Sequence, residues 1–185
     1  DLGNVVKRIV ETGYDLIPAD RVSVFLVDRE AEELVLIVSE DAAGYHMPIS
    51  AGIAGAVATS GQVENVADAY TDVRFNQSFD KQTNYRTRSV LAVPVHKAKG
   101  DVIAVIQAIN RTDGEPFNAE DEAMLRAVAN AAAVALTQAR LLKDAHAETD
   151  KALALVEAGS IIEQAERRSS DLYQMLNDLV SKVAS

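Results

Sequence analysis

The 185-residue chain has no cysteine and no tryptophan, and only four prolines and three histidines. Without cysteine it can form no disulfide bond, zinc–thiolate site or thioether link to a chromophore, and it has no thiol nucleophile. The histidines, His46, His96 and His146, are far apart in the sequence, and none has a second ligand-type residue at metal spacing. The sequence therefore predicts no metal site.

Long hydrophobic runs are also missing. No apolar run approaches the roughly 20 residues of a membrane-spanning helix, and the N-terminus lacks the basic-then-apolar layout of a signal peptide. The formal net charge of −10 argues against non-specific binding to nucleic acid or to an anionic membrane. We expect a cytoplasmic protein that binds neither nucleic acid nor a membrane. Because the chain begins without Met and ends in helix-like sequence, we expect a fragment of a longer protein.

Catalytic motifs are absent as well. The sequence has no G-x-S-x-G, no H-E-x-x-H and no paired carboxylates in a convincing context. Gly52-x-x-Gly55 lacks the GK[ST] of a phosphate-binding loop, and a glycine before a helix is usually only an N-terminal breaker. We therefore predict no catalytic residue and no enzyme within these residues.

What the chain does contain is enough apolar sequence, 48% of residues, for a core. Apolar residues three or four apart predict a helix over residues 2–17, which ends before Pro18. Strand-like runs cover 21–28, 33–39, 89–95 and 101–110, with an extended piece at 45–50 and a short helix from Gly52 to Gly61. Because most of these strands follow one another without crossover helices, the sequence predicts an antiparallel α+β fold.

A long helical pattern begins after residue 117. Asn118 is the expected N-cap, and acidic residues in the first turn suit the helix dipole. At Gly159 the helix either ends and restarts with the capping box Ser160-x-x-Glu163, or continues at a cost of ~1 kcal/mol. The 4-3-4 spacing of the apolar residues beyond it favours either a coiled coil with a partner or packing on the same chain; these residues are Leu172, Leu176, Leu179 and Val183.

The polar stretch at 62–87 has no clear regular structure. Four interspersed aromatic residues argue against disorder, and long connections of this kind are usually either functional or disordered. Composition alone leaves open a packed loop or a segment that covers a ligand. Its last eight residues, DKQTNYRT, lead directly into the strand SVLAVPV.

One family shares these features. The run GIAGAVATSGQVENVADAYTDVRFNQSFDKQTNYRTRSVLAVPV, followed by VIAVIQAIN, resembles the GAF domains that precede the catalytic domain in cyclic-nucleotide phosphodiesterases and some bacterial adenylyl cyclases. A signature of the cyclic-nucleotide-binding members is also present and is expected to be structural: Asn110, Arg111, Phe117, Asp121 and Glu122. Arg111 replaces the usual lysine, and an Arg111–Asp121 pair is expected.

The resemblance implies a fold and a domain division. It implies an antiparallel sheet with helices packed on one face, a lid over the other, and a long C-terminal helix. Residues 1–145, with the N-terminal helix 1–18, would form the GAF domain. Residues 146–185 would form a helical linker or coiled-coil-like extension.

The resemblance also implies a buried site for one cyclic nucleotide, with no other cofactor. The backbone of Ile53 and Ala54 would meet the phosphate, as a helix N-terminus can. The other implied ligand-binding residues are Asn76 in the lid; Asp80, Thr83 and Thr87 near ribose and phosphate; Ser23 and Gln107 at the purine; and Ser39 and Glu40 in a nearby loop. Each has a simpler interpretation as an outward-facing strand residue, a cap or a turn residue.

Gln107 favours cAMP over cGMP, because an amide can accept from the adenine amino group and donate to a ring nitrogen. We therefore expect a sensor that signals through its C-terminal helix to an output domain, either a catalytic domain or a second GAF domain. The full-length protein would be a phosphodiesterase or an adenylyl cyclase, and a homodimer would form through the terminal helices. The alternatives are a ligand-free dimerisation module and a sensor for another small molecule.

Overall fold

The computed structural model describes residues 2–38, 44–98 and 100–183, without the side chains of residues 2, 38, 79, 82, 166, 170–174 and 176–183. The chain forms two units, Asp1–Arg140 and Leu141–Ser185. The first unit contains the sheet and the candidate site. The second consists of the distal part of the last helix.

The first unit is built on one antiparallel sheet with the strand order β3-β2-β1-β6-β5-β4. The α+β class and the antiparallel sheet are as predicted. The strands are β1 (Ala19–Asp28), β2 (Glu33–Val38), β3 (Tyr45–Pro48), β4 (Glu64–Val66), β5 (Val90–His96) and β6 (Val102–Arg111). The helices are α1 (Leu2–Leu16), α2 (Gly52–Ser60), a 3₁₀ turn η1 (Ala69–Thr71), α3 (Ser78–Thr83) and α4 (Ala119–Val183).

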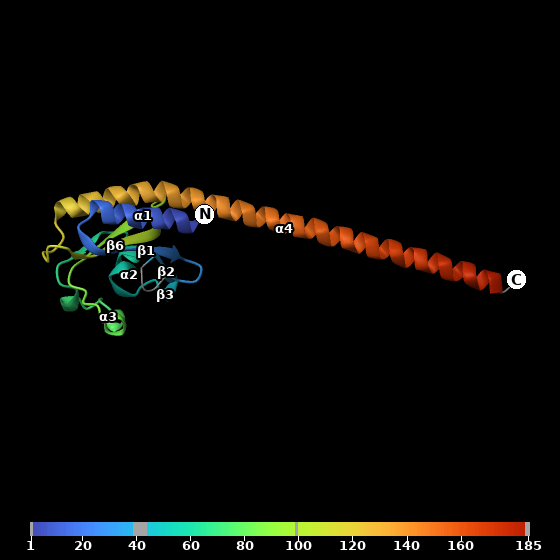
Figure 1. Cartoon of the computed structure of the whole chain (residues 1–185), viewed down its shortest axis with the longest axis horizontal. Helices are drawn as coiled ribbons and strands as arrows, with labels where there is room; N and C mark the ends of the chain where they lie inside the picture. The colour runs from blue at the N-terminus through green and yellow to red at the C-terminus, as the bar shows by residue number, and fades with distance from the viewer. Residues whose placement is uncertain (1, 39–43, 99, 184–185) are drawn as a thin grey trace. The chain divides into compact units, whose positions relative to one another are not determined.

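Helices cover both faces of the sheet, as Figure 1 shows, with α1 and the beginning of α4 on one side and α2 on the other. The apolar face of α1, which includes Val6 and Val10, packs with Leu125 and Leu136 of α4 against β1, β5 and β6. The opposite core joins α2 to β1, β2, β5 and β6. Because both faces are covered, β5 is buried over nearly its whole length.

The two glycines of the 52–55 motif have separate structural roles. Gly52 has a positive φ of 70°, where residues with a side chain are strained. A Cβ on Gly55 would lie 2.6 Å from the carbonyl carbon of Ser50 and 2.7 Å from the carbonyl oxygen of Ile49. Gly55 therefore allows the chain after β3 to cross closely over α2. The motif is more than the helix breaker that the sequence suggested.

Helix α4 begins where the sequence predicts. Asn118 is its N-cap, because its Oδ1 accepts hydrogen bonds from the backbone N–H groups of Glu120 (2.9 Å) and Asp121 (3.0 Å). The helix is continuous through Gly159, so the break considered there is wrong. The side chains at all four positions of the proposed 4-3-4 pattern, 172, 176, 179 and 183, lie outside the described residues. Among the helices that the structure describes, none could cross a bilayer.

Candidate functional site

A pocket of about 200 Å³ lies between the sheet and the segment from β4 to β5, which we call the lid (residues 67–89). Small-molecule sites usually measure roughly 300–1,000 Å³, so this cavity is smaller than most of them. The pocket is lined by Arg21, Ser23, Phe25, Leu36, Tyr45, Met47, Pro48, Ala51, Gly52, Ile53, Ala54, Phe75, Asn76, Ser78, Asp80, Tyr85, Thr87, Val90, Gln107 and Ile109.

The floor of the pocket carries two polar side chains on adjacent strands. Ser23 of β1 and Gln107 of β6 are paired in the sheet register and both line the cavity. Within the described part of the chain, neither side chain has a hydrogen-bond partner. Both groups are therefore free to bond to a ligand, and the purine contact that the resemblance implies for them stays a prediction.

The N-terminus of α2 forms one wall. Ile53 and Ala54 are 4% and 3% exposed and line the pocket. The N-cap residue, Ala51, has no side chain that could cap the helix. Because the first N–H groups of a helix have no intrahelical partner and carry the positive end of its dipole, this wall suits an anion.

The lid carries a buried carboxylate. Asp80 of α3 is 4% exposed, and its Oδ2 accepts hydrogen bonds from the Thr87 N–H (2.7 Å) and the Tyr70 hydroxyl (3.1 Å). Its Oδ1 accepts from the Thr87 hydroxyl at 2.8 Å. Asp80 and Thr87 thus line the pocket and also hold α3 against the end of the lid.

The remaining predicted ligand-binding residues differ in how the structure places them. Asn76 lines the pocket, and its Oδ1 caps the Ser78 N–H at 2.9 Å. Thr83 lies at the end of α3 and is not among the residues that line the cavity, so a ligand contact there stays a prediction. Ser39 and Glu40 lie outside the described residues.

Arg21 and Tyr85 are pocket residues that the sequence did not indicate. The Arg21 guanidinium lies 3.9 Å from the centre of the Tyr85 ring, and burial raises the pKa of Tyr85. Arg21 is on β1 and Tyr85 is in the lid, so only the fold brings them together. The alternation of β1 places Arg21 on the same face as Ser23, and this was the available signal.

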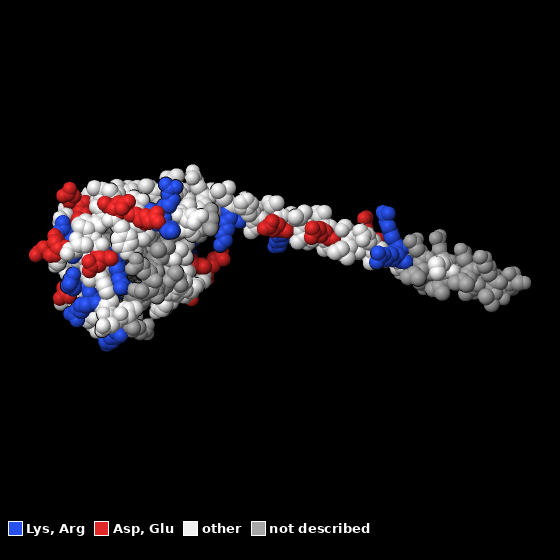
Figure 2. Space-filling view, in the orientation of Figure 1, with Lys and Arg blue, Asp and Glu red and all other residues white. Residues whose placement is uncertain are grey.

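A cluster of ion pairs around Arg74 attaches the lid to Glu64 of β4. Arg74 pairs with both carboxylate oxygens of Glu64, at 2.8 and 2.9 Å, and with Asp72 at 2.7 Å. The hydrogen bond from Arg74 lowers the pKa of Asp72. The hydrogen bonds to Asp72 and Glu64 raise the pKa of Arg74. Acidic and basic side chains are interspersed over the visible face of the first unit (Figure 2).

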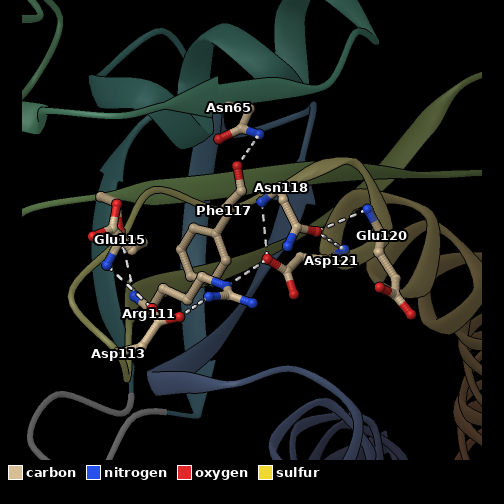
Figure 3. A network of polar contacts seen from close by, with 9 residues as sticks. Asn65, Arg111, Asp113, Glu115, Phe117, Asn118, Glu120 and Asp121 are labelled. Carbon is tan, nitrogen blue, oxygen red and sulfur yellow. Dashed lines mark hydrogen bonds and ion pairs between the residues drawn. The ribbon is translucent and has the colours of Figure 1, made fainter.

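Three of the signature residues, Arg111, Phe117 and Asp121, belong to a polar network at the beginning of α4, shown in Figure 3. The expected Arg111–Asp121 pair is present, with Arg111 Nε 2.8 Å from Asp121 Oδ2, and this hydrogen bond raises the pKa of Arg111. Arg111 also pairs with Asp113. Phe117 is buried, and its carbonyl accepts from Asn65 Nδ2 at 3.0 Å.

Asn110 and Glu122 complete the signature. Asn110 is 2% exposed and contacts the end of the lid, while Glu122 forms a surface pair with Arg126. None of the five signature residues lines the pocket itself. In the described residues no group of three histidine, cysteine or acidic side chains could hold a metal ion.

Comparison with known proteins identifies the family of the chain. The family model described as "GAF domain" matches residues 1–136. The chain belongs to the GAF family.

Relatives of this GAF domain include the dual 3′,5′-cyclic-AMP and -GMP phosphodiesterase 11A of Takifugu rubripes, 29% identical over 98% of this chain and 21% of that protein. The dual 3′,5′-cyclic-AMP and -GMP phosphodiesterase 11 of Drosophila melanogaster is 35% identical over 71% of this chain and 9% of that protein. The chain therefore spans only a small part of these relatives. Among solved structures, the GAF domain of a phosphoenolpyruvate-protein phosphotransferase from Coxiella burnetii has a TM-score of 0.69, with 21% identity over 78% of this chain and 87% of that one.

Proposed function

We propose that this GAF domain binds one cyclic nucleotide in the pocket, prefers cAMP to cGMP, and signals through α4 to an output domain in the cytoplasm. The observation that carries the proposal is the buried, uncapped N-terminus of α2, which faces a cavity with free polar groups on its floor. The names of the relatives, which are cAMP and cGMP phosphodiesterases, support this ligand class.

We assign each part of a cyclic nucleotide to a different wall of the pocket. The backbone N–H groups of Ile53 and Ala54 would bind the single negative charge of the cyclic phosphate, for which a helix N-terminus suffices. The Thr87 hydroxyl and Asp80 would lie toward ribose and phosphate, and Asn76 would close over them. The purine would lie on the apolar side chains beside Ser23 and Gln107.

The preference for cAMP depends on Gln107. Its amide can accept from the adenine 6-amino group and donate to a ring nitrogen, whereas a carboxylate can only accept and would suit guanine N1–H and the 2-amino group. We therefore expect Gln107→Glu to lower the affinity for cAMP at least ~10-fold and to shift selectivity toward cGMP. The loss of one hydrogen bond to the base accounts for a change in affinity of this size.

Isothermal titration of the 185-residue chain with cAMP and cGMP tests both statements. Gln62→Glu is the matched control, because it adds the same charge at an exposed position outside the pocket lining. Absence of heat together with absence of a thermal shift for either nucleotide at millimolar concentration would exclude the proposed ligand. Equal effects of the two Gln→Glu variants would show that Gln107 does not contact the base.

Signalling requires that the nucleotide bind two conformations of the domain with different affinity. The relatives that this chain matches are much longer than it is. We propose that the output domain is catalytic, as in a phosphodiesterase or an adenylyl cyclase, or is a second GAF domain. We predict no catalytic function for the GAF domain itself.

Dimerisation through the terminal helices is a second proposed function. In the second unit several apolar side chains are mostly exposed, among them Leu155 (68%), Val156 (69%) and Ile161 (66%). Such side chains along a helix suit a partner helix. We expect removal of residues 160–185 to lower the dimer fraction measured by light scattering, whereas an unchanged dimer would exclude this segment as the interface.

A further inference from the structure

The exit of the lid is held by one buried amide. Asn110 Nδ2 donates to the Tyr85 hydroxyl and to the Arg86 carbonyl, both at 2.8 Å, and Oδ1 accepts from the Arg88 N–H at 2.6 Å. An asparagine amide has two donor hydrogens and one acceptor oxygen, and here all are engaged. The amide orientation is determined by these partners, because the Arg88 N–H needs an acceptor and the Arg86 carbonyl needs a donor.

The backbone of Asn110 reinforces this position. Its φ is 55°, a left-handed conformation that asparagine tolerates better than most residues. Its N–H donates to the Ser89 carbonyl at 2.9 Å, and the Ser89 hydroxyl accepts from the Arg111 N–H at 3.3 Å. The end of β6 is therefore bonded to the end of the lid through both side chains and backbone.

The next residue, Arg111, connects the end of β6 to the beginning of α4. Arg111 binds Asp121, which is 6% exposed, and the same carboxylate oxygen accepts from the Asn118 N–H at 2.9 Å. On the opposite side, Tyr85 lines the pocket and lies under Arg21. Two adjacent residues, Asn110 and Arg111, thus join a pocket-lining lid residue to the N-terminus of the long helix.

We propose that Asn110 is the positioning residue that fixes the exit of the lid and couples the pocket to the first turn of α4. Outward movement of the lid at Tyr85 pulls on the hydrogen bonds of the Asn110 amide. Through the backbone at the end of β6, the same movement displaces the Arg111–Asp121 pair. The coupling half of this inference rests on the proposed binding of a cyclic nucleotide. The positioning half depends only on contacts within the chain.

Hydrogen–deuterium exchange of the ligand-free full chain tests the positioning half. Asn110→Gly removes the amide and keeps the left-handed backbone accessible. We expect about 10-fold faster exchange in α3 and residues 85–88, as loss of these hydrogen bonds increases local opening. Tyr85→Phe removes one partner and should give a smaller increase in the same segment. Unchanged exchange in the lid of Asn110→Gly would overturn the inference.

Asn65→Ala is the matched control. It also removes an amide-to-carbonyl hydrogen bond, from Asn65 to Phe117 just before α4, and the partner of this bond lies outside the lid. It should leave exchange in the lid unchanged, and equal acceleration of the lid in both variants would reduce Asn110 to a general stabilising residue and contradict the proposal.

The coupling half is tested by exchange with cAMP at saturation, confirmed by titration for each variant. In the wild-type chain we expect cAMP to slow exchange in the first turn of α4, and in Asn110→Gly we expect this response to disappear although cAMP still binds. A response that persists in Asn110→Gly would refute the coupling. Absence of cAMP binding to the wild-type chain would refute the proposed function, whereas the ligand-free comparison would still decide the role of Asn110.

Discussion

Replacement of Gly55 by alanine is expected to lower the free energy of unfolding of the first unit by about 3 kcal/mol. Helix propensity alone predicts the opposite sign, because alanine in a helix is favoured over glycine by up to ~1 kcal/mol. The steric contact decides the sign. The new Cβ would lie 2.6 Å from the Ser50 carbonyl carbon, and a backbone atom cannot move aside as the end of a flexible side chain can.

Urea titration followed by tyrosine fluorescence measures this loss. The control is Gly159→Ala, which also replaces a helical glycine but has no heavy atom within 4 Å of the added Cβ. The control should leave the transition of the first unit unchanged. A stabilised Gly55→Ala variant would mean that the 49–50 segment does not cross α2 as closely as the structure indicates.

Replacement of Asp80 by alanine is expected to weaken cAMP binding about 10- to 100-fold and to cost about 3 kcal/mol of stability. The carboxylate accepts three hydrogen bonds, two of them from Thr87. Thr87 is 3% exposed, so its backbone N–H would be left buried without an acceptor. The domain should remain folded, because native domains usually have ~5–15 kcal/mol of stability.

Titration of cAMP and thermal unfolding of the same samples separate the two effects. Lys81→Ala, an exposed substitution in the same helix, should change neither quantity. Thr87→Ala and the double variant complete a thermodynamic cycle, and we expect the two losses to be markedly non-additive because the groups share hydrogen bonds. Additive losses with unchanged affinity would place Asp80 and Thr87 outside the binding mechanism.

The sequence predicted the sheet well because its strands have strong apolar patterns. Ser23 and Gln107, which only the family resemblance singled out, both line the pocket, and their contact with a purine stays a prediction. The sequence missed α3, a polar six-residue helix that ends with Asn84 in a left-handed conformation. Such a helix depends on tertiary contacts, here the buried Asp80, more than on local propensity.

Other features depend on how the chain folds back on itself and have no local pattern. Arg21 meets Tyr85 only because the lid folds back over β1. The close approach at Gly55 comes from a crossing of two backbone segments, and composition showed only a glycine before a helix. At Gly159 the local signal for a break was weak, because one glycine costs a long helix only ~1 kcal/mol.

The strand order has a consequence for how the protein acquires its pocket. Strands β1 and β6 lie side by side in the sheet although they are near opposite ends of the first unit, and their pairing brings Ser23 beside Gln107. Closing such a long loop is slow compared with forming a hairpin or a helix. During synthesis the floor cannot form until β6 has left the ribosome, so the pocket matures late and a nascent chain that stops before β6 has no complete pocket.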